Sequence, residues 1–384
     1  MGSHSRRMRR VVNSLRRPDG IPVTAAKAIR RVDVIRRSRW RQTHRAASRE
    51  VAPPDAPRAV VAVIAHWRNR DTAGQTRSAD ERSAILTQVV ESLIDLEAHS
   101  VTVVVLSNDA AGAARKLAAR LRSEAASVRV ARRTSEVFSL PASRRDIVAL
   151  QWRPGLVHRH GYYLTWGHVP VLRRATRTGR FTHFLYLEDD TLFTPGHLRY
   201  WCTHRAPLAE HGLIPGFVRV ERDDGDLYLV DESAPIPSTR PRVAVECPGR
   251  GTVRFIAMPS AYQGMYLLDT PLAVEHFRFS AARSPLLSRT VRWGARERAT
   301  IGPIFDDVPP GLWSRNVVPV HEEADGPHLD PACLIEHLAA VYVHKEHLAL
   351  GTIPVGAAFE GPVDVTVAPP PGSTPAEPTQ PAGS

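Results

Sequence analysis

Residues 59–131 alternate between short apolar runs and longer segments with helical character, and this alternation constrains the fold more than any other feature of the chain. The apolar runs are rich in β-branched residues and have the length of buried strands. A chain that alternates strand and helix in this way forms a parallel sheet with helices on its faces. The predicted strands are Ala59–Ala65, Val101–Leu106 and Val128–Ala131, and the predicted helices are Ser78–Glu97 and Ala110–Ala126.

Polar residues follow the first two predicted strands. His66 and Arg68 come after the first strand, and Asp109 comes after the second. In open α/β sheets ligands bind beyond the carboxyl ends of the strands, so these three residues are candidates for binding a ligand there. The alternative for each is an ordinary exposed loop residue.

The best-known phosphate-binding motifs are absent from the sequence. No G-x-G-x-x-G follows the first strand, no G-x-x-x-x-G-K-[ST] occurs anywhere, and Ala65–Ala73 contains no glycine. Dinucleotide binding and P-loop chemistry are therefore disfavoured. Mg²⁺-dependent nucleotidyl transfer stays open as an alternative, although it usually brings a glycine-rich loop near the first strand.

The segment Phe181–Asp190 runs from an apolar strand, predicted over Phe181–Leu187 after a helix over Gly167–Arg177, directly into Glu188, Asp189 and Asp190. Three adjacent carboxylates repel one another, and burial adds a desolvation cost that a divalent cation would relieve. Oxygen ligands favour Mg²⁺ or Mn²⁺. Strand alternation predicts that Glu188 and Asp190 share one face. The alternative is a solvated acidic turn that merely ends the strand.

A β-α-β-α-β start followed by Phe-Leu-Tyr-Leu-Glu-Asp-Asp resembles the GT-A fold of nucleotide-sugar glycosyltransferases, over roughly residues 59–354. Glu188-Asp189-Asp190 is similar to the E-D-D form of that superfamily's D-x-D motif. The resemblance implies a Rossmann-like, mostly parallel central sheet flanked by helices, with a mixed acceptor-side second half. It implies that Asp190 binds the metal bridging a nucleoside diphosphate, and that Glu188 and Asp189 contact the ribose or the metal and its waters. His66, Arg68 and Asp109 then become candidates for binding the nucleotide sugar.

Histidines late in the chain are further candidates, because the resemblance implies that one of them contacts the metal or the diphosphate. They are His337, His344 and His347, of which His337 is taken as the predicted metal ligand, and His168 is of similar rank. None has the H-E-x-x-H zinc spacing. The alternative for each is a surface or capping histidine.

On the acceptor side, Trp293-Gly294 and a following acid resemble the acceptor segment of inverting GT-A enzymes. Glu297 is the predicted general base that takes the acceptor hydroxyl's proton, and Asp307 is the alternative base. Trp293 and Tyr262 are predicted to contact the acceptor. The competing interpretations are that Glu297 pairs with a neighbouring arginine on a surface helix and that Tyr262 packs in the core. The role for a base assumes inversion of the sugar's configuration.

The charge is concentrated in residues 1–50, which hold 15 Lys and Arg against three acids; the remaining residues hold 36 basic and 36 acidic groups. The balanced charge of the remaining residues disfavours a protein-wide nucleic-acid interface. The basic segment is predicted to adsorb to an anionic membrane surface. The alternatives are a solvated extension or a polyanion-binding protein that acts through this segment.

The chain is predicted to divide into a basic arm and Pro-rich linker (1–57), a catalytic domain (58–360, with halves 58–194 and 195–360) and a disordered tail (361–384). The second half is predicted to include a strand near Gly264–Leu268 and a helix over Asp330–Ala340. Three scattered cysteines without a C-x-x-C pair indicate neither a disulfide framework nor a zinc site. With no signal-peptide pattern and no long apolar run, we expect a cytoplasmic enzyme, peripheral at the inner face of the membrane.

Overall fold

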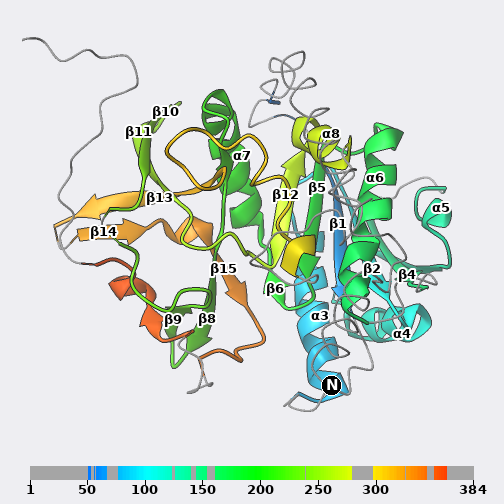
Figure 1. The fold of residues 1–384 in the computed structure, drawn as a ribbon. Helices are drawn as coiled ribbons and strands as arrows, with labels where there is room; N and C mark the ends of the chain where they lie inside the picture. Colours follow the sequence, from blue (N-terminus) through cyan, green and yellow to red (C-terminus); the bar gives the residue numbers. More distant parts are fainter. Residues whose placement is uncertain are drawn as a thin grey trace, which may run out of the picture.

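The protein is an α/β chain with one large sheet and two smaller ones, seen in a computed structural model (Figure 1). The structure describes residues 51–52, 56, 58–66, 77–122, 126–139, 144–153, 161–237, 239–278, 297–324, 326–343 and 350–360. The predictions for residues 1–50, Arg68, Trp293, His344, His347 and the tail 361–384 lie outside these ranges. None of the described helices is both long enough and apolar enough to cross a membrane.

The central sheet has six strands in the order β12-β5-β1-β2-β4-β3. Every neighbouring pair is parallel except β12 and β5, which are antiparallel. The predicted α/β class is confirmed, and the arrangement is Rossmann-like. The strands are β1 (Ala59–His66), β2 (Ser100–Ser107), β3 (Ser127–Ala131), β4 (Arg145–Gln151), β5 (His183–Glu188) and β12 (Met265–Asp269).

The strand β4 had no counterpart in the prediction, yet it separates β2 from the edge strand β3. Its five central residues are buried, whereas β3 buries only its last residue fully. Strands covered on both faces read as continuous apolar runs, and β1, β2 and β5 have this pattern. Full burial of each Val, Leu or Ile side chain contributes about 1.5–3 kcal/mol, so these strands form the main core of the protein.

Capping residues mark the ends of several helices. Ser78 and Glu81 form a reciprocal capping box at the start of α3, and Thr194 caps α7 ahead of Pro195. Gly179, with φ of 65°, ends α6 in the left-handed conformation. The helices are α3 (Ala79–Ile94), α4 (Ala110–Arg120), α5 (Thr134–Val137), α6 (His168–Thr178), α7 (Pro195–Glu210) and α8 (Thr270–Arg278).

The connections place these helices on both faces of the central sheet. The chain runs from β1 through β2 toward β4 in one direction and then returns through α6 to β5 on the other side of β1. Because parallel crossovers are right-handed, this reversal puts α6 on the face opposite α3. Ligands bind at such a reversal point, beyond the carboxyl ends of β1 and β5.

The second part of the chain builds the two smaller sheets, which lie to the left of the central sheet in Figure 1. One has the order β10-β11-β13-β14, with β7 beside β13, and the other has the order β16-β9-β8-β15-β6. Their strands are β6 (Thr191–Leu192), β7 (Ile214–Pro215), β8 (Val218–Asp223), β9 (Asp226–Leu229), β10 (Arg242–Cys247), β11 (Gly251–Ala257), β13 (Asn316–Glu323), β14 (Gly326–Leu329), β15 (Leu334–His337) and β16 (Ile353–Pro354).

The predicted helix over Asp330–Ala340 is wrong. Asp330 caps a single 3-10 turn, and the chain then enters the strand β15, which pairs in parallel with β8. Burial along β15 alternates with a period of two residues, as expected for a strand. Tertiary pairing therefore outweighed the helical propensity of this short segment. The error concerns the site directly, since β15 ends at His337.

Each of the two predicted halves contributes one strand to a sheet formed mainly by the other half. The short strand β6, from the first half, pairs antiparallel with β15, and β12, from the second half, forms the edge of the central sheet. Residues from both halves share one hydrophobic core, which includes Ile64 and Ile335. The residues just after β5 are consequently held between the central sheet and the β8–β15 sheet.

Candidate functional site

The three carboxylates of Glu188-Asp189-Asp190 lie at the carboxyl end of β5, where the central sheet meets the sheet containing β15. Glu188 is the last residue of the strand and is only 4% exposed. The side chains of Asp189 and Asp190 are 30% and 22% exposed. Each carboxylate faces a different partner, so the cluster divides into three environments.

Asp189 faces His66, the last residue of β1. Its Oδ2 lies 2.7 Å from the Nδ1 of His66, which is buried. The parallel pairing of β1 with β5, which brings Ala65 beside Glu188, sets up this contact. Two residues predicted to bind the nucleotide sugar are thus adjacent, at the reversal point of the sheet.

Asp190 faces His337. The Oδ2 of Asp190 lies 3.2 Å from the Nε2 of His337, and the other ring nitrogen, Nδ1, lies 2.6 Å from the Oε1 of Glu221. The pairing of Thr191 with His337 between β6 and β15 brings them together. Burial lowers the pKa of His337, but the carboxylates of Asp190 and Glu221 outweigh burial and raise that pKa to about 9.

Glu221 is fully buried, and its carboxylate contacts backbone groups in addition to His337. Its carboxylate also accepts hydrogen bonds from the backbone N–H groups of Val341, Tyr342 and Val343, at 2.9, 2.7 and 3.0 Å. Burial raises the pKa of Glu221, but the hydrogen bonds from His337 and the backbone outweigh it, and the pKa is lowered. One ionised side chain therefore orients His337 and fixes the segment that follows β15.

Glu188 belongs to a different network. It accepts a hydrogen bond of 2.9 Å from the hydroxyl of Tyr262 and lies 4.0 Å from Nη1 of Arg219. Arg219 makes two hydrogen bonds of 2.8 Å to the carboxylate of Asp231, and its guanidinium lies 4.5 Å from the centre of the Tyr262 ring. Burial lowers the pKa of Arg219, but Asp231 outweighs it and holds the pKa well above the ordinary value. Arg219 is therefore a permanent cation.

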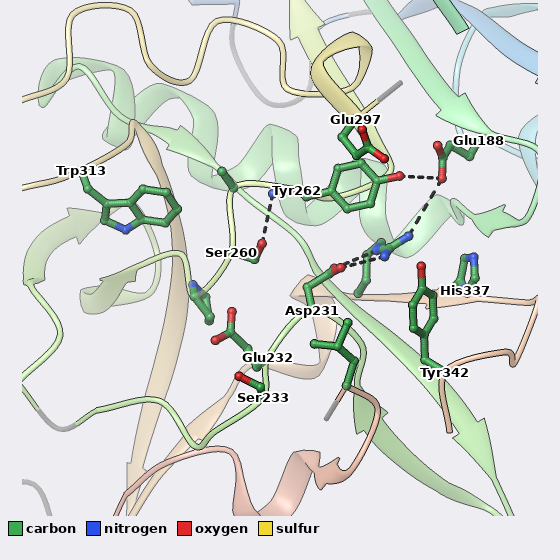
Figure 2. Close-up of a pocket in the computed structure, with 14 residues that line it drawn as sticks. Glu188, Asp231, Glu232, Ser233, Ser260, Tyr262, Glu297, Trp313, His337 and Tyr342 are labelled. Atoms are coloured by element: carbon green, nitrogen blue, oxygen red, sulfur yellow. Dashed lines mark hydrogen bonds and ion pairs between the residues drawn. The ribbon is translucent and has the colours of Figure 1, made fainter. Parts of the chain in front are cut away.

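A cavity of about 400 Å³ opens between these two networks. Four residues predicted from the sequence line it together: Glu188, Tyr262, Glu297 and His337. Figure 2 shows Tyr262, Glu297 and Glu188 on one side of this cavity and Glu232 with Ser233 on the other. The remaining lining residues are Arg219, Asp231, Glu232, Ser233, Pro259, Ser260, Ala261, Trp313, Tyr342 and Leu350.

Other predicted candidates lie away from the cavity lining. Asp109 caps helix α4, where its side chain accepts a 2.9 Å hydrogen bond from the backbone of Gly112. Asp307 is exposed on a turn with a φ of 60°. His168 is buried against Tyr186 with ring centres 3.8 Å apart, and burial lowers its pKa to about 3. His168 is therefore a neutral core residue.

Gly264, directly before β12, lies where the backbone comes close to other groups of the site. Its φ is 65°, and a Cβ atom there would lie 3.2 Å from Oγ1 of Thr191 and 3.4 Å from Cδ of Arg219. Its carbonyl accepts a hydrogen bond from the backbone N–H of Glu188. The close approach in this structure is therefore to other protein groups, which fix the backbone of Glu188.

Sequence reasoning missed several residues of the site, namely Glu221, Arg219, Asp231, Glu232, Tyr342 and Trp313. The first four residues of β8, Val-Arg-Val-Glu, are all buried. Their alternation of apolar and charged residues is the pattern of a half-exposed strand, so no local pattern marked Arg219 and Glu221 as buried charges.

The donor set near Asp190 is compatible with a divalent cation that is shared with a ligand. In the described part of the chain, no group of three or more His, Cys, Asp or Glu side chains is arranged to hold a metal alone. Mg²⁺ and Mn²⁺ sites that also use substrate phosphates need only one or two carboxylates, because phosphates and water complete them. The Nδ1 contact of His337 with Glu221 is the arrangement that metal-binding histidines usually have.

Comparison with known proteins gives no assignment. The chain matches no protein-family model, and the search of curated proteins finds no match to it. The geometry of these residues is therefore the basis on which a function is proposed.

Proposed function

We propose that this protein is a metal-dependent glycosyltransferase that moves a sugar from a nucleoside diphosphate sugar to a hydroxyl acceptor. The observation that carries the proposal is the contact of Asp190 with His337, which is oriented by Glu221, beside a cavity lined by Glu188 and Glu297. The Asp190–His337 contact and the cavity both lie at the carboxyl end of the central sheet, where α/β folds bind ligands. The resemblance of Glu188-Asp189-Asp190 to the E-D-D motif of GT-A enzymes supports the same conclusion.

Asp190 and His337 are the residues that would hold Mn²⁺ or Mg²⁺, with oxygens of the diphosphate and of water as the other ligands. When bound, the cation would stabilise the negative charge that develops on the diphosphate leaving group. His66 and Asp189, which contact each other at 2.7 Å, are proposed to bind the nucleoside side of the donor.

Glu297 is proposed as the general base. The acceptor hydroxyl oxygen forms a bond to the anomeric carbon, and the bond from that carbon to the diphosphate oxygen breaks, with the electron pair leaving on the diphosphate. The hydroxyl proton passes to the Glu297 carboxylate. Glu297 lines the same cavity as Glu188, and among the described residues its carboxylate has no ion-pair partner. The role of Glu297 as base assumes that the reaction inverts the configuration at the anomeric carbon.

Glu188 is proposed to orient the sugar or ribose rather than to bind the cation directly. Its Oε2 accepts the Tyr262 hydroxyl and lies near the Arg219 guanidinium, so its charge is already compensated by protein groups. Tyr262 is then held at the cavity wall, where its ring can cover an apolar face of the acceptor. Arg219 fixes both residues through the Asp231 pair.

The first test is thermal stability across UDP, GDP, CDP, TDP and ADP, each with and without Mn²⁺. A ligand at 100 times its dissociation constant stabilises the folded state by about 2.7 kcal/mol. We expect one diphosphate to raise the melting temperature in a Mn²⁺-dependent way, and Asp190→Asn to abolish the shift. Asp226→Asn, at an exposed position in β9, is the matched control and should retain it.

A flat panel, or an equal shift in Asp190→Asn, would contradict the proposal. Product analysis separates it from nucleotidyl transfer: glycosyl transfer releases a nucleoside diphosphate, whereas nucleotidyl transfer releases pyrophosphate. We also propose that residues 1–50 adsorb to anionic membranes, which hold the enzyme near its acceptor. Equal binding of the full chain and of a chain lacking residues 1–50 to phosphatidylserine vesicles would contradict that role.

A further inference from the structure

The end of the central sheet opposite the cavity carries exposed arginines. Strands β1, β2, β4 and β5 run parallel, so all four begin at this end. Arg144 directly precedes β4, Arg177 lies in the last turn of α6, and Arg180 lies between α6 and β5. All three residues are exposed, and Nη1 of Arg180 donates a 3.3 Å hydrogen bond to the carbonyl of Phe138. These three are the amino-end arginines.

Within the described ranges, none of the amino-end arginines forms an ion pair with a carboxylate. The carboxylates of Glu97 and Asp269, at the same end, contact Arg199 and Arg205 instead. Asp95 is exposed, but it ends α3 on the other face of the sheet. The adjoining sequence outside those ranges adds no acid, since 140–143 has no charged residue and 279–296 has four arginines. This end is therefore positively charged on the side of α6.

Helix α8 adds an apolar side chain to the same end. It begins beside the start of β5, where Oγ1 of Thr270 donates a 3.4 Å hydrogen bond to the carbonyl of Thr182. Figure 1 shows α8 at the upper end of the central sheet, away from β6. Thr270, Val274 and Arg278 are exposed and follow one another at intervals of four residues, so they share one side of the helix. Val274 is 43% exposed.

The basic segment 1–50 joins the fold at this end as well. Only residues 51–58 separate it from Ala59, the first residue of β1. The segment holds 15 Lys and Arg against three acids. Its point of attachment is thus the end of the sheet that bears the amino-end arginines.

We propose that the face formed by the amino-end arginines and the exposed side of α8 docks on an anionic phospholipid membrane. The guanidinium groups bind the phosphates and carboxylates of the lipid head groups, and Val274 enters the boundary with the acyl chains. A nucleic acid also offers phosphates, but it has no apolar layer for Val274. The inference goes beyond the glycosyltransferase proposal and does not depend on it.

The docked orientation leaves the cavity open to solvent. Strand β1 has eight residues and rises about 3.3 Å per residue, so about 26 Å separate the two ends of the sheet. The cavity lies at the far end, lined by residues such as Glu188 and His337. The folded domain thus shares membrane binding with residues 1–50 and determines which way the site faces, which a tethering segment alone does not fix.

The first test measures binding of the full chain to vesicles of phosphatidylserine and phosphatidylcholine in equal parts. All three amino-end arginines are changed to glutamine together: Arg144→Gln, Arg177→Gln and Arg180→Gln. We expect about a fivefold loss of affinity for each arginine, or about a hundredfold for the three. The matched control loses the same net charge at three exposed positions in the smaller sheets: Arg222→Gln, Arg250→Gln and Arg254→Gln. The control should bind like wild type, because charges far from the lipid are screened.

The second test measures the orientation with a thiol-linked fluorophore whose emission shifts to the blue in lipid. The native cysteines Cys202, Cys247 and Cys333 are all buried, so labelling is directed to an introduced thiol. Thr270→Cys places the label on the exposed side of α8, and Asp226→Cys places it in β9. We expect the vesicles to shift the emission of the first label only.

Equal vesicle binding by the glutamine variant and wild type would overturn the inference. So would a blue shift at Asp226→Cys without one at Thr270→Cys, or equally tight binding to pure phosphatidylcholine. Binding of a polyuridine oligonucleotide without binding of the vesicles would assign the face to a nucleic acid and overturn it too. Failure of the glycosyltransferase proposal is separable, because nucleoside diphosphate binding is measured without lipid.

Discussion

The two ends of strand β5 hold the same kinds of residue in very different arrangements. At the amino end, His183 neighbours Asp269, which lies 2.9 Å from Arg205. At the carboxyl end, Glu188 and Asp190 neighbour Arg219 and His337. All of these side chains except Asp190 are less than a tenth exposed. A carboxylate, a guanidinium and an imidazole are thus buried at both ends of one strand.

The difference lies in how the charges balance. At the amino end one carboxylate meets one guanidinium, and burial lowers the pKa of His183 to about 4 even though Asp269 opposes this shift, so the histidine is neutral. At the carboxyl end burial lowers the pKa of His337, but the carboxylates of Asp190 and Glu221 outweigh burial and raise that pKa to about 9. His337 and Glu188 at this end also line a cavity. The comparison teaches that a charged histidine shared by two carboxylates beside a cavity, rather than the residue types, distinguishes the candidate site from a structural ion pair.

The largest expected effect comes from the proposed base at the carboxyl end. Glu297→Gln keeps the shape of the side chain but removes its ability to accept a proton, so kcat should fall by about 10²–10⁴-fold. Steady-state turnover of the donor identified by the stability panel measures this. Asp307→Asn tests the alternative base, and turnover close to wild type is expected because Asp307 does not line the cavity. Loss of turnover in Asp307→Asn, with turnover near wild type in Glu297→Gln, would identify Asp307 as the general base.

Removal of either buried guanidinium should destabilise the fold strongly. Arg219→Met and Arg205→Met each leave a buried carboxylate without its cation, which costs about 3–5 kcal/mol. Denaturant unfolding measures the loss. Arg222→Met removes an exposed ion pair with Glu336, for which about 1 kcal/mol or less is expected. If Arg219→Met cost no more than this control, the carboxyl-end network would not have the structural role assigned to it.

Glu221→Gln should weaken the site without unfolding it. The amide can still contact His337 but no longer carries the charge that orients the ring, and such changes beside metal ligands typically lower metal affinity by about 10–100-fold. Mn²⁺ affinity in the presence of the bound diphosphate, followed by electron paramagnetic resonance of free Mn²⁺, is the measurement. Glu246→Gln, exposed in β10, is the control. Unchanged Mn²⁺ affinity in Glu221→Gln would argue that His337 is not a ligand.

The smallest effect concerns acid stability at the amino end. His183 has a folded-state pKa of about 4, below its unfolded value, so the unfolded chain binds a proton first as the pH falls. Stability is complete above about pH 6.5 and declines between there and about pH 4, with a loss of about 1.4 kcal/mol at pH 5.5. The loss is measured as the difference between the unfolding free energies above about pH 6.5 and at about pH 5.5, for the wild type and for His183→Gln. Equal pH dependence in both proteins would contradict the neutral state of His183.

The sequence predicted the first part of the fold well, because that part is governed by local patterns. The apolar β-branched runs predicted the ends of β1, β2 and β5 to within about two residues, and α3 and α4 begin at or next to the predicted residue. The helix α4, however, ends at Arg120 rather than at the predicted Ala126, and Asp109 caps it instead of binding a ligand at the cavity. The prediction also missed β4, and it mistook β15 for a helix. Short strands that receive their stability from pairing with distant segments carry little local signal.

The candidate site shows the same division. The residues Glu188-Asp189-Asp190 and their position at a strand end follow from the sequence alone, because an apolar run that meets three acids must end at a polar edge. Their three different partners come from β1, β8 and β15. Strand pairing brings His66 and His337 to carboxylates that lie more than a hundred residues away in the chain. Only the tertiary structure decided that His337 faces Asp190, that Arg219 compensates Asp231, and that Glu297 and Glu232 border one cavity. The physical reason is that long-range strand pairing and burial determine which charges meet, and no local pattern encodes them.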